Sequence, residues 1–192
     1  SDLGLFGLGG VIGTMPFWVQ LLAGLFVLNV VQYWVHRTFH GRRLWAFHAV
    51  HHSSEHLDWL SSVRVHPVNE MVGRMIGAIP LLLLGFNPVV FAVVVPVTTL
   101  YAIMLHATLD GRFGPLRHVL ASPAVHRWHH SSDDAARDKN FAGLFPVIDM
   151  LFGTHYLPDE APTAFGTPQD AVPEGVLGQL AHPFRRRCSQ AA

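Results

Sequence analysis

Histidine is the residue type that dominates the candidate chemistry of this sequence. Fourteen of the 192 residues are histidine, and most of them fall in three short motifs, HRTFH, HAVHH and HRWHH. The motifs contain His36 and His40, then His48, His51 and His52, and finally His126, His129 and His130. Residues three or four positions apart lie on the same face of a helix. Each motif therefore predicts a set of imidazoles that point in one direction.

Convergent imidazoles of this kind indicate a metal site. Neutral imidazole is a good ligand for zinc, iron, copper and nickel, whereas protonated imidazoles packed together repel one another. A first-row metal takes about four to six ligands, so eight clustered histidines suit two metal ions. The single cysteine, Cys188, excludes an internal disulfide and a zinc site built from several cysteines. We interpret His56, His118, His155 and His182 as histidines without a metal role.

Two apolar regions would position these histidines at the edge of a membrane. Half of the chain is hydrophobic and only 14% is charged. Residues 16–35 carry no formal charge and are long enough to cross the bilayer core. Residues 75–109 are also uncharged but too long for one span, and the sequence GFNP at 85–88 is typical of a turn. We therefore expect a helical hairpin over 70–86 and 88–108, the alternative being a pair of buried core helices.

The distribution of arginines predicts which side of the membrane the histidines face, and a change in composition predicts a domain boundary. A hairpin returns the chain to its starting face, so the arginines that flank the apolar regions can share one side, which the positive-inside rule makes cytoplasmic. Those arginines are Arg37, Arg42, Arg43, Arg64, Arg74, Arg112, Arg117, Arg127, Arg185, Arg186 and Arg187. Residues 1–157 would form the domain, and residues 158–192 a tail rich in proline, alanine and glycine that lies on the surface or is partly disordered. The formal net charge of zero gives no reason to expect a nucleic acid partner.

The order of the histidine motifs around a membrane hairpin resembles the fatty acid hydroxylase / sterol desaturase superfamily. The likeness runs over residues 18–157 and includes VQYWVHRTFH, FHAVHHSSEHLDWLSSVRVHP, LHATL, SPAVHRWHHS and KNFAGLFPVIDMLFGT. The resemblance implies an all-α membrane bundle of three or four spans with a cytosolic helical cap that holds a histidine-ligated dimetal site. It also implies two iron ions, for which zinc can substitute, O2 as co-substrate, and hydroxylation or desaturation of a lipid C–H bond.

The same resemblance implies particular metal ligands and supporting residues. The implied ligands are His36, His40, His48, His51, His52, His126, His129 and His130, with His106 as a further one. Some relatives have another histidine where this chain has Asp110. Three alternatives follow: Asp110 ligates the metal, His66 fills that ligand position, or one metal has an open position. We favour His66. Asn29 stands where the family often has aspartate, and Asn140 and Asp149 match polar positions that could orient ligating imidazoles. Asp149 could equally cap a helix or pair with an arginine.

The chain itself has no motif that would bind an organic oxidant or an iron–sulfur cluster. Electrons would therefore come from a donor of the cytochrome b5 or ferredoxin type, and Arg42, Arg43, Arg117 and Arg127 suit such a partner and lipid headgroups equally. Two other functions remain open at this point. A membrane metal transporter would use intramembrane histidines, and a zinc-dependent lipid hydrolase would use zinc-bound water.

Overall fold

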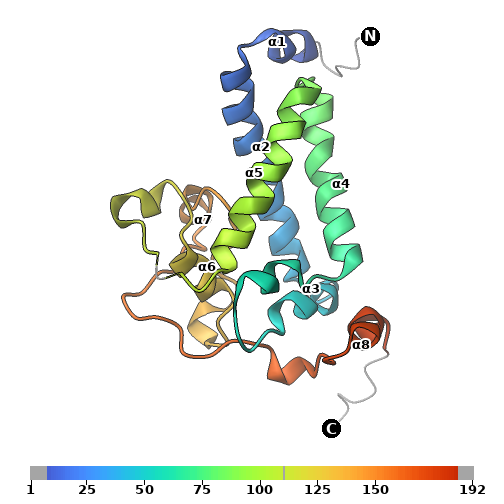
Figure 1. The fold of residues 1–192 in the computed structure, drawn as a ribbon, viewed down its shortest axis with the longest axis vertical. Helices are drawn as coiled ribbons and strands as arrows, with labels where there is room; N and C mark the ends of the chain where they lie inside the picture. The colour runs from blue at the N-terminus through green and yellow to red at the C-terminus, as the bar shows by residue number, and fades with distance from the viewer. Residues whose placement is uncertain (1–7, 110, 186–192) are drawn as a thin grey trace.

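The computed structural model describes residues 8–109 and 111–185, which form helices and connecting segments without a β-strand. Figure 1 shows the long helices side by side, with most of the shorter helices gathered at one end and α1 (Leu8–Thr14) at the other. We call the long helices the neck; they are α2 (Phe17–Phe39), α4 (Pro67–Leu83) and α5 (Pro88–His106). We call the short elements at their end the cap; they are α3 (Trp45–His52), η1 (Trp59–Val63), η2 (Gly114–His118), α6 (Pro123–His129), η3 (Asp134–Ala136), α7 (Val147–Leu151), η4 (Pro168–Asp170), α8 (Val176–Ala181) and η5 (His182–Phe184). The short helix α1 (Leu8–Thr14) precedes the neck. The all-α prediction is thus confirmed for the described residues.

The predicted hairpin is present, with boundaries a few residues from those expected. Helix α4 ends at Leu83 and α5 begins at Pro88, so the turn falls at the expected GFNP sequence. Gly85 adopts a φ of 73°, a left-handed conformation that glycine tolerates without a Cβ clash. The Asn87 side chain accepts a hydrogen bond from the Val89 amide at 2.9 Å and so caps α5.

Small residues allow α2 and α4 to pack closely. The Gln32 amide on α2 donates a hydrogen bond to the Gly73 carbonyl on α4 at 2.8 Å. A Cβ atom added at Gly77 would lie 2.6 Å from Gln32 Nε2 and 2.8 Å from Leu28 Cδ1. Glycine at these positions is the device by which membrane helices bring their backbones together.

The surface of the neck is apolar. Helices α2 and α5 are long and apolar enough to span a membrane, and only 22% and 17% of their most apolar stretches lie inside the protein. Large side chains such as Trp18, Leu22 and Leu100 are about two-thirds exposed or more, at 71%, 66% and 67%. A soluble protein would bury such helices in its core, so the neck indicates a membrane protein. Helix α4 has 17 residues and is shorter than these two; the predicted number of spans and the cytoplasmic side of the cap remain predictions.

The described part of the C-terminal tail is folded against the cap. Trp128 Nε1 donates a hydrogen bond to the Glu160 carbonyl at 3.2 Å, and Ser131 forms an isolated bridge with Phe165. Further along, Trp45 Nε1 donates to Asp170 at 2.9 Å. These contacts carry the described part of the tail from α6 to α3 across the cap; residues 186–192 lie outside the described residues.

Candidate metal centre

Nine histidines come together where the neck meets the cap, in two adjacent groups. The first group contains His36, His40, His48, His52 and His129, and the second contains His51, His106, His126 and His130. Within each group the ligand nitrogens all lie within 4.8 Å of one another. The ring of His52 stacks on the ring of His130 with centroids 4.3 Å apart, so the two groups are in direct contact. Nine of the ten histidines that we predicted as ligands are therefore brought together.

Helical spacing explains how each element presents its histidines, and the structure adds a division that the spacing did not predict. His36 lies in the last turn of α2 and His40 caps that helix, so the two share one face. On α3, however, His48 and His52 join the first group while His51 joins the second. Helix α6 is divided in the same way, since His129 belongs to the first group and His126 and its cap His130 to the second. Each HxxHH motif thus contributes to both groups.

The second group shows an arrangement of imidazoles that a cation would stabilise. His51 Nδ1 and His106 Nδ1 lie 3.2 Å and 2.7 Å from the carbonyl oxygens of Arg64 and Ala102. A carbonyl only accepts hydrogen bonds, so both Nδ1 atoms carry the proton and donate. Each neutral ring then has a lone pair on Nε2, and these two Nε2 atoms are 3.2 Å apart. Two lone pairs at this distance repel each other unless a positive ion lies between them.

The first group has the same arrangement. His36 Nδ1 donates to the Phe141 carbonyl at 2.9 Å, and His129 Nδ1 donates to the Lys139 carbonyl at 2.7 Å. His48 Nδ1 lies 2.8 Å from Asn69 Oδ1. The Nε2 atoms of His36 and His48 are 2.9 Å apart, and His129 Nε2 is buried without a hydrogen-bond partner among the described residues. For a metal–nitrogen bond of about 2.1 Å, two ligating nitrogens are separated by about 3.0–3.4 Å, so the observed spacing fits metal ligation.

Burial keeps these imidazoles neutral. Removal from water lowers the pKa of His48, His52 and His130 well below the ordinary histidine value, and neighbouring imidazoles lower it further. Burial likewise lowers the pKa of His40, although Asp138, whose Oδ1 is 3.2 Å from His40 Nδ1, opposes this shift. Neutral imidazole is the form that binds metals.

Asn140 and Asp149 support the centre, but neither touches a ligating imidazole. The buried Asp149 carboxylate accepts hydrogen bonds from the amides of Phe141 and Ala142 at 2.8 Å and 2.9 Å, and from Thr154 Oγ1 at 2.8 Å. Burial raises the pKa of Asp149, while these donors oppose the shift. The Asn140 amide donates to Val125 O at 3.0 Å. Both residues therefore hold the segment 139–142, whose carbonyls orient His36 and His129.

Asn29 also acts on the closing segment and not on the first histidine motif. Its Oδ1 accepts a hydrogen bond from the Phe145 amide at 3.0 Å, and its side chain is buried. Asn29 thus ties the middle of α2 to the segment between Asn140 and α7. The family's aspartate at this position led us to expect an influence on the first motif, whereas the contact observed here is structural.

His66 is the predicted ligand that the structure places elsewhere, and this corrects our preference for it. His66 is the N-cap of α4: its Nδ1 accepts a hydrogen bond from the Val68 amide at 3.2 Å. Its Nε2 consequently carries the proton and donates to the Leu180 carbonyl, also at 3.2 Å. Both ring nitrogens are used, and the ring packs on Phe47 and Phe184 outside the two groups. The alternative ligand, Asp110, lies outside the described residues.

Several orienting groups could not be recognised in the sequence. Asn69 follows His66 in the sequence HPVN, but the histidine that it supports is His48, which lies 21 residues earlier in the chain. Asp138 lies two residues before Asn140 and contacts His40. The remaining acceptors are main-chain carbonyls, which every residue carries, so the sequence holds no signal for them.

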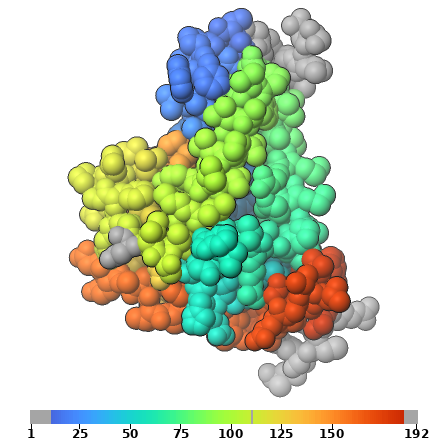
Figure 2. All heavy atoms as spheres, viewed as in Figure 1, coloured from blue at the N-terminus to red at the C-terminus, as the bar shows by residue number. Residues whose placement is uncertain are grey.

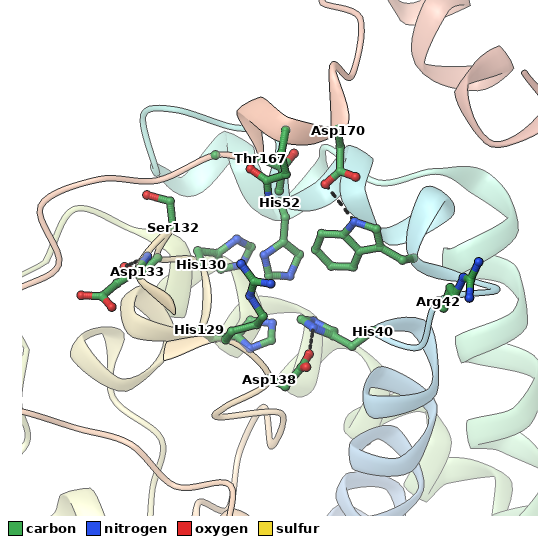
Figure 3. Close-up of a pocket in the computed structure, with 15 residues that line it drawn as sticks. His40, Arg42, His52, His129, His130, Ser132, Asp133, Asp138, Thr167 and Asp170 are labelled. Atoms are coloured by element: carbon green, nitrogen blue, oxygen red, sulfur yellow. Dashed lines mark hydrogen bonds and ion pairs between the residues drawn. The ribbon is translucent and has the colours of Figure 1, made fainter. Parts of the chain in front are cut away.

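A cavity of about 370 Å³, lined mostly by polar and charged residues, reaches the histidines. Figure 3 shows His40, His52, His129 and His130 close together in this cavity, with the tail residues Thr167 and Asp170 beside them. Arginines and carboxylates line it together, including Arg42, Arg137, Asp133 and Asp138. The cavity gives water and small solutes a route to the histidines.

Comparison with known proteins bears directly on this centre. A family model described as fatty acid hydroxylase matches residues 21–154, which include all nine clustered histidines. The ornithine lipid hydroxylase OlsE of Rhizobium tropici is 36% identical over 174 residues, which cover 90% of this chain and 52% of that protein. The alkylglycerol monooxygenases of Danio rerio and Homo sapiens are 37% and 35% identical over 150 and 153 residues, which cover 78% and 79% of this chain and 33% and 31% of those proteins.

This chain therefore spans about half or less of the length of these curated relatives. The comparison with solved structures found no match. The family match covers most of the chain, and it covers the segment in which the histidine motifs had indicated the same family. The chain belongs to the fatty acid hydroxylase family.

Proposed function

We propose that this chain is a membrane lipid hydroxylase whose two histidine groups bind two iron ions. One observation carries the proposal: in two contiguous groups of histidines, Nε2 atoms of neutral imidazoles face one another. The Nε2 atoms of His51 and His106, for example, are 3.2 Å apart. When bound, iron supplies the activation of O2 and the redox chemistry for oxidising an unactivated C–H bond. Zinc binds imidazole as well, so metal identity needs the experiment below.

The side chains of the protein serve to hold and orient the metal ligands. Hydrogen bonds from Nδ1 to carbonyl oxygens fix the tautomer and the ring orientation, as at His36 and His129. The nine ligands come from α2, α3, α5 and α6, so the folded neck and cap determine the relative positions of the two ions. The ligands include no carboxylate among the described residues, which distinguishes this centre from di-iron bundles that use glutamate.

The position of the centre favours a lipid substrate. Trp34, which is 45% exposed on the neck, stands two residues before His36, a distance of about 3 Å along a helix axis. The apolar surface therefore extends almost to the first ligand. A lipid in the membrane could bring a C–H bond to this level without leaving the apolar surface. The names of the relatives, ornithine lipid hydroxylase and alkylglycerol monooxygenase, favour hydroxylation over desaturation.

Electrons would enter through the cavity that is lined by polar and charged residues. It reaches His40, His52, His129 and His130, and its lining carries Arg42 and Arg137 together with the carboxylates of Asp133, Asp138 and Asp170. Each hydroxylation consumes one O2, two electrons and two protons and releases one water. A carrier of the cytochrome b5 or ferredoxin type would dock at this mouth, where lining charges of both signs would meet complementary charges on the carrier. Turnover with each purified donor, compared with a chemical reductant, identifies the type.

The proposal is tested with the full chain, expressed in iron-rich medium and reconstituted in lipid nanodiscs. We expect two irons per chain and, with ¹⁸O2 and a reductant, a lipid alcohol that carries one ¹⁸O atom. His129→Ala should lose metal and activity, whereas His56→Ala, which changes an exposed histidine outside both groups, should retain both. An alkene product would indicate a desaturase.

The two alternative functions predict different results in the same preparation. A zinc-dependent lipid hydrolase would contain zinc and release product without O2. A metal transporter would move labelled metal into liposomes without a lipid product, and it would be expected to hold its ligands near the membrane midplane. Here the ligands lie at the cap end of the neck, which favours the hydroxylase.

A further inference from the structure

The C-terminal helices of the cap expose an apolar surface that the metal centre does not explain. Val176 and Leu177 on α8 are 72% and 82% exposed, and Phe184 at the end of η5 is 68% exposed. These large side chains follow one another within nine residues, and a patch of this kind on a folded surface marks an interaction site. We call this element the α8–η5 segment (Val176–Phe184).

The α8–η5 segment is attached at the level where the neck meets the cap. His66, the N-cap of α4, donates to the Leu180 carbonyl of α8, and Phe184 packs on Phe47 with ring centroids 5.6 Å apart. Figure 1 shows α8 beside the cap end of α4, and Figure 2 shows it as a lobe on the outside of the cap. The hydrogen bond of His66, which was predicted as a metal ligand, thus holds this segment in place.

Charges on α4 indicate where the membrane surface lies. Glu70 and Arg74 form an ion pair on the exposed side of α4, and every residue from Met75 to the end of the helix is uncharged. The ion pair therefore marks the headgroup layer. His66 precedes Glu70 by one helical turn, which is about 6 Å along the axis. The α8–η5 segment consequently lies within about one turn of the headgroup layer, where interfacial amphipathic helices are found.

A basic cavity of about 430 Å³ lies at the end of the α8–η5 segment, where its lining includes Pro183 and Arg185, the sequence neighbours of the exposed Phe184. Arg42 and Arg43 enter it from the turn between α2 and α3, and Arg185 and His182 enter it from the end of the α8–η5 segment. Asp170 is a carboxylate in the lining and accepts a hydrogen bond from Trp45. The described part of the lining thus has three guanidinium groups and one carboxylate, which leaves an excess of positive charge.

We propose that the α8–η5 segment inserts into the interface of the membrane that the neck occupies, and that the basic cavity binds the phosphate of an anionic phospholipid headgroup. Guanidinium groups pair with phosphate through parallel hydrogen bonds. An apolar face beside a basic group is the combination that holds interfacial segments on anionic membranes. This inference goes beyond the proposed function and does not depend on which reaction the metal centre catalyses.

The test follows the environment of a fluorophore on the α8–η5 segment of the full chain. Cys188→Ser removes the native cysteine, and Leu177→Cys then provides the single site for the fluorophore NBD. The protein is placed in nanodiscs of phosphatidylcholine, alone or with increasing fractions of phosphatidylglycerol, and quenching by brominated lipid is recorded. A matched protein carries the label at Ala135→Cys, an exposed position on η3.

We expect brominated lipid to quench the label at position 177 and not the label at position 135, and phosphatidylglycerol to increase the quenching at 177. Arg43→Gln with Arg185→Gln should raise the phosphatidylglycerol fraction needed for half of this response by about fivefold per arginine. Arg137→Gln, which removes one positive charge outside the basic cavity, should leave the response unchanged. Inorganic phosphate added to phosphatidylcholine nanodiscs should have no effect.

Three results would overturn the inference. Equal quenching at positions 177 and 135 would show that the segment stays in water. An unchanged response in the Arg43→Gln, Arg185→Gln protein would show that the cavity does not bind the headgroup. The same increase on addition of inorganic phosphate would show that the cavity binds free phosphate and not a lipid.

Discussion

Replacement of Asp149 by alanine tests whether the segment 139–142 positions the first histidine group. Asp149 is fully buried and accepts hydrogen bonds from the amides of Phe141 and Ala142 and from the Thr154 hydroxyl. Alanine would leave two buried amides without an acceptor. Each such group costs about 1–3 kcal/mol, so the segment should lose about 2–6 kcal/mol of stability.

The loss should be transmitted to one metal site and not to the other. The Phe141 and Lys139 carbonyls in this segment accept the hydrogen bonds of His36 and His129. Loss of such an outer partner typically lowers metal affinity by about 10–100-fold. The carbonyls that orient His51 and His106 belong to Arg64 and Ala102, which Asp149 does not contact. We therefore expect the first histidine group to lose metal affinity while the second group keeps it.

The assay is a chelator competition on the purified protein in nanodiscs, with metal per chain measured at each chelator concentration. The parent should release both ions at high chelator, and Asp149→Ala should release one ion at about 10–100-fold lower chelator than the other. Asp149→Asn keeps one acceptor oxygen and should fall between the two. Asp133→Ala removes an exposed carboxylate that caps η3 and should behave like the parent. Simultaneous release of both ions, or release as in the parent, would refute the reasoning.

Two further predictions concern His66 and pH. His66→Ala should keep the full metal content but loosen the α8–η5 segment, because the hydrogen bond to Leu180 is lost. Metal analysis measures the first effect, and limited proteolysis near residues 171–185 measures the second. Loss of one ion would restore His66 as a ligand. Burial lowers the pKa of His52, His126 and His130, so the unfolded chain takes up protons below the ordinary histidine pKa of about 6.5 and the folded metal-free chain does not. Stability of the chelator-treated protein should hold above about pH 6.5 and fall steadily as the pH decreases below it; thermal unfolding across this range would contradict the prediction if it showed no dependence on pH.

The sequence was informative wherever chemistry depended on local spacing. The GFNP turn was recognisable from residue types alone, because glycine and proline restrict the backbone in known ways. The HxxxH and HxxHH motifs also identified eight of the nine clustered histidines before the fold was known, and the family resemblance implied the ninth, His106. Helical spacing indicates a shared face, but one face can serve two sites that lie side by side. The assignment of His51 and His129 to different groups from their motif neighbours therefore required the structure.

His66 illustrates the opposite case. A histidine before a proline at the start of an apolar helix is well placed to cap that helix with its own side chain, as His66 does for the Val68 amide. The family resemblance and the missing tenth ligand favoured a metal role, and the capping role competed with it. The second contact, to Leu180, joins residues 114 positions apart. Contacts of this range have no local sequence signal, and the same holds for the carbonyls that orient His36 and His129.

The candidate metal ligands are buried beside a small apolar core, which would link metal binding to folding. This buried apolar cluster comprises Tyr33 from the neck helix α2, Phe141 and Ala142 from the segment that leads into α7, and Ile148 from α7 itself, whereas nine imidazoles lie at the junction of neck and cap. Without ions, pairs of Nε2 atoms face each other at 2.9–3.2 Å, an arrangement that costs free energy. An ion in the first group would join α3 and α6 to the neck helix α2, and an ion in the second group would join them to α5. Ions that bind the folded state and not the unfolded chain stabilise it by mass action, so the two ions that we propose would hold the cap on the neck as well as supply its chemistry.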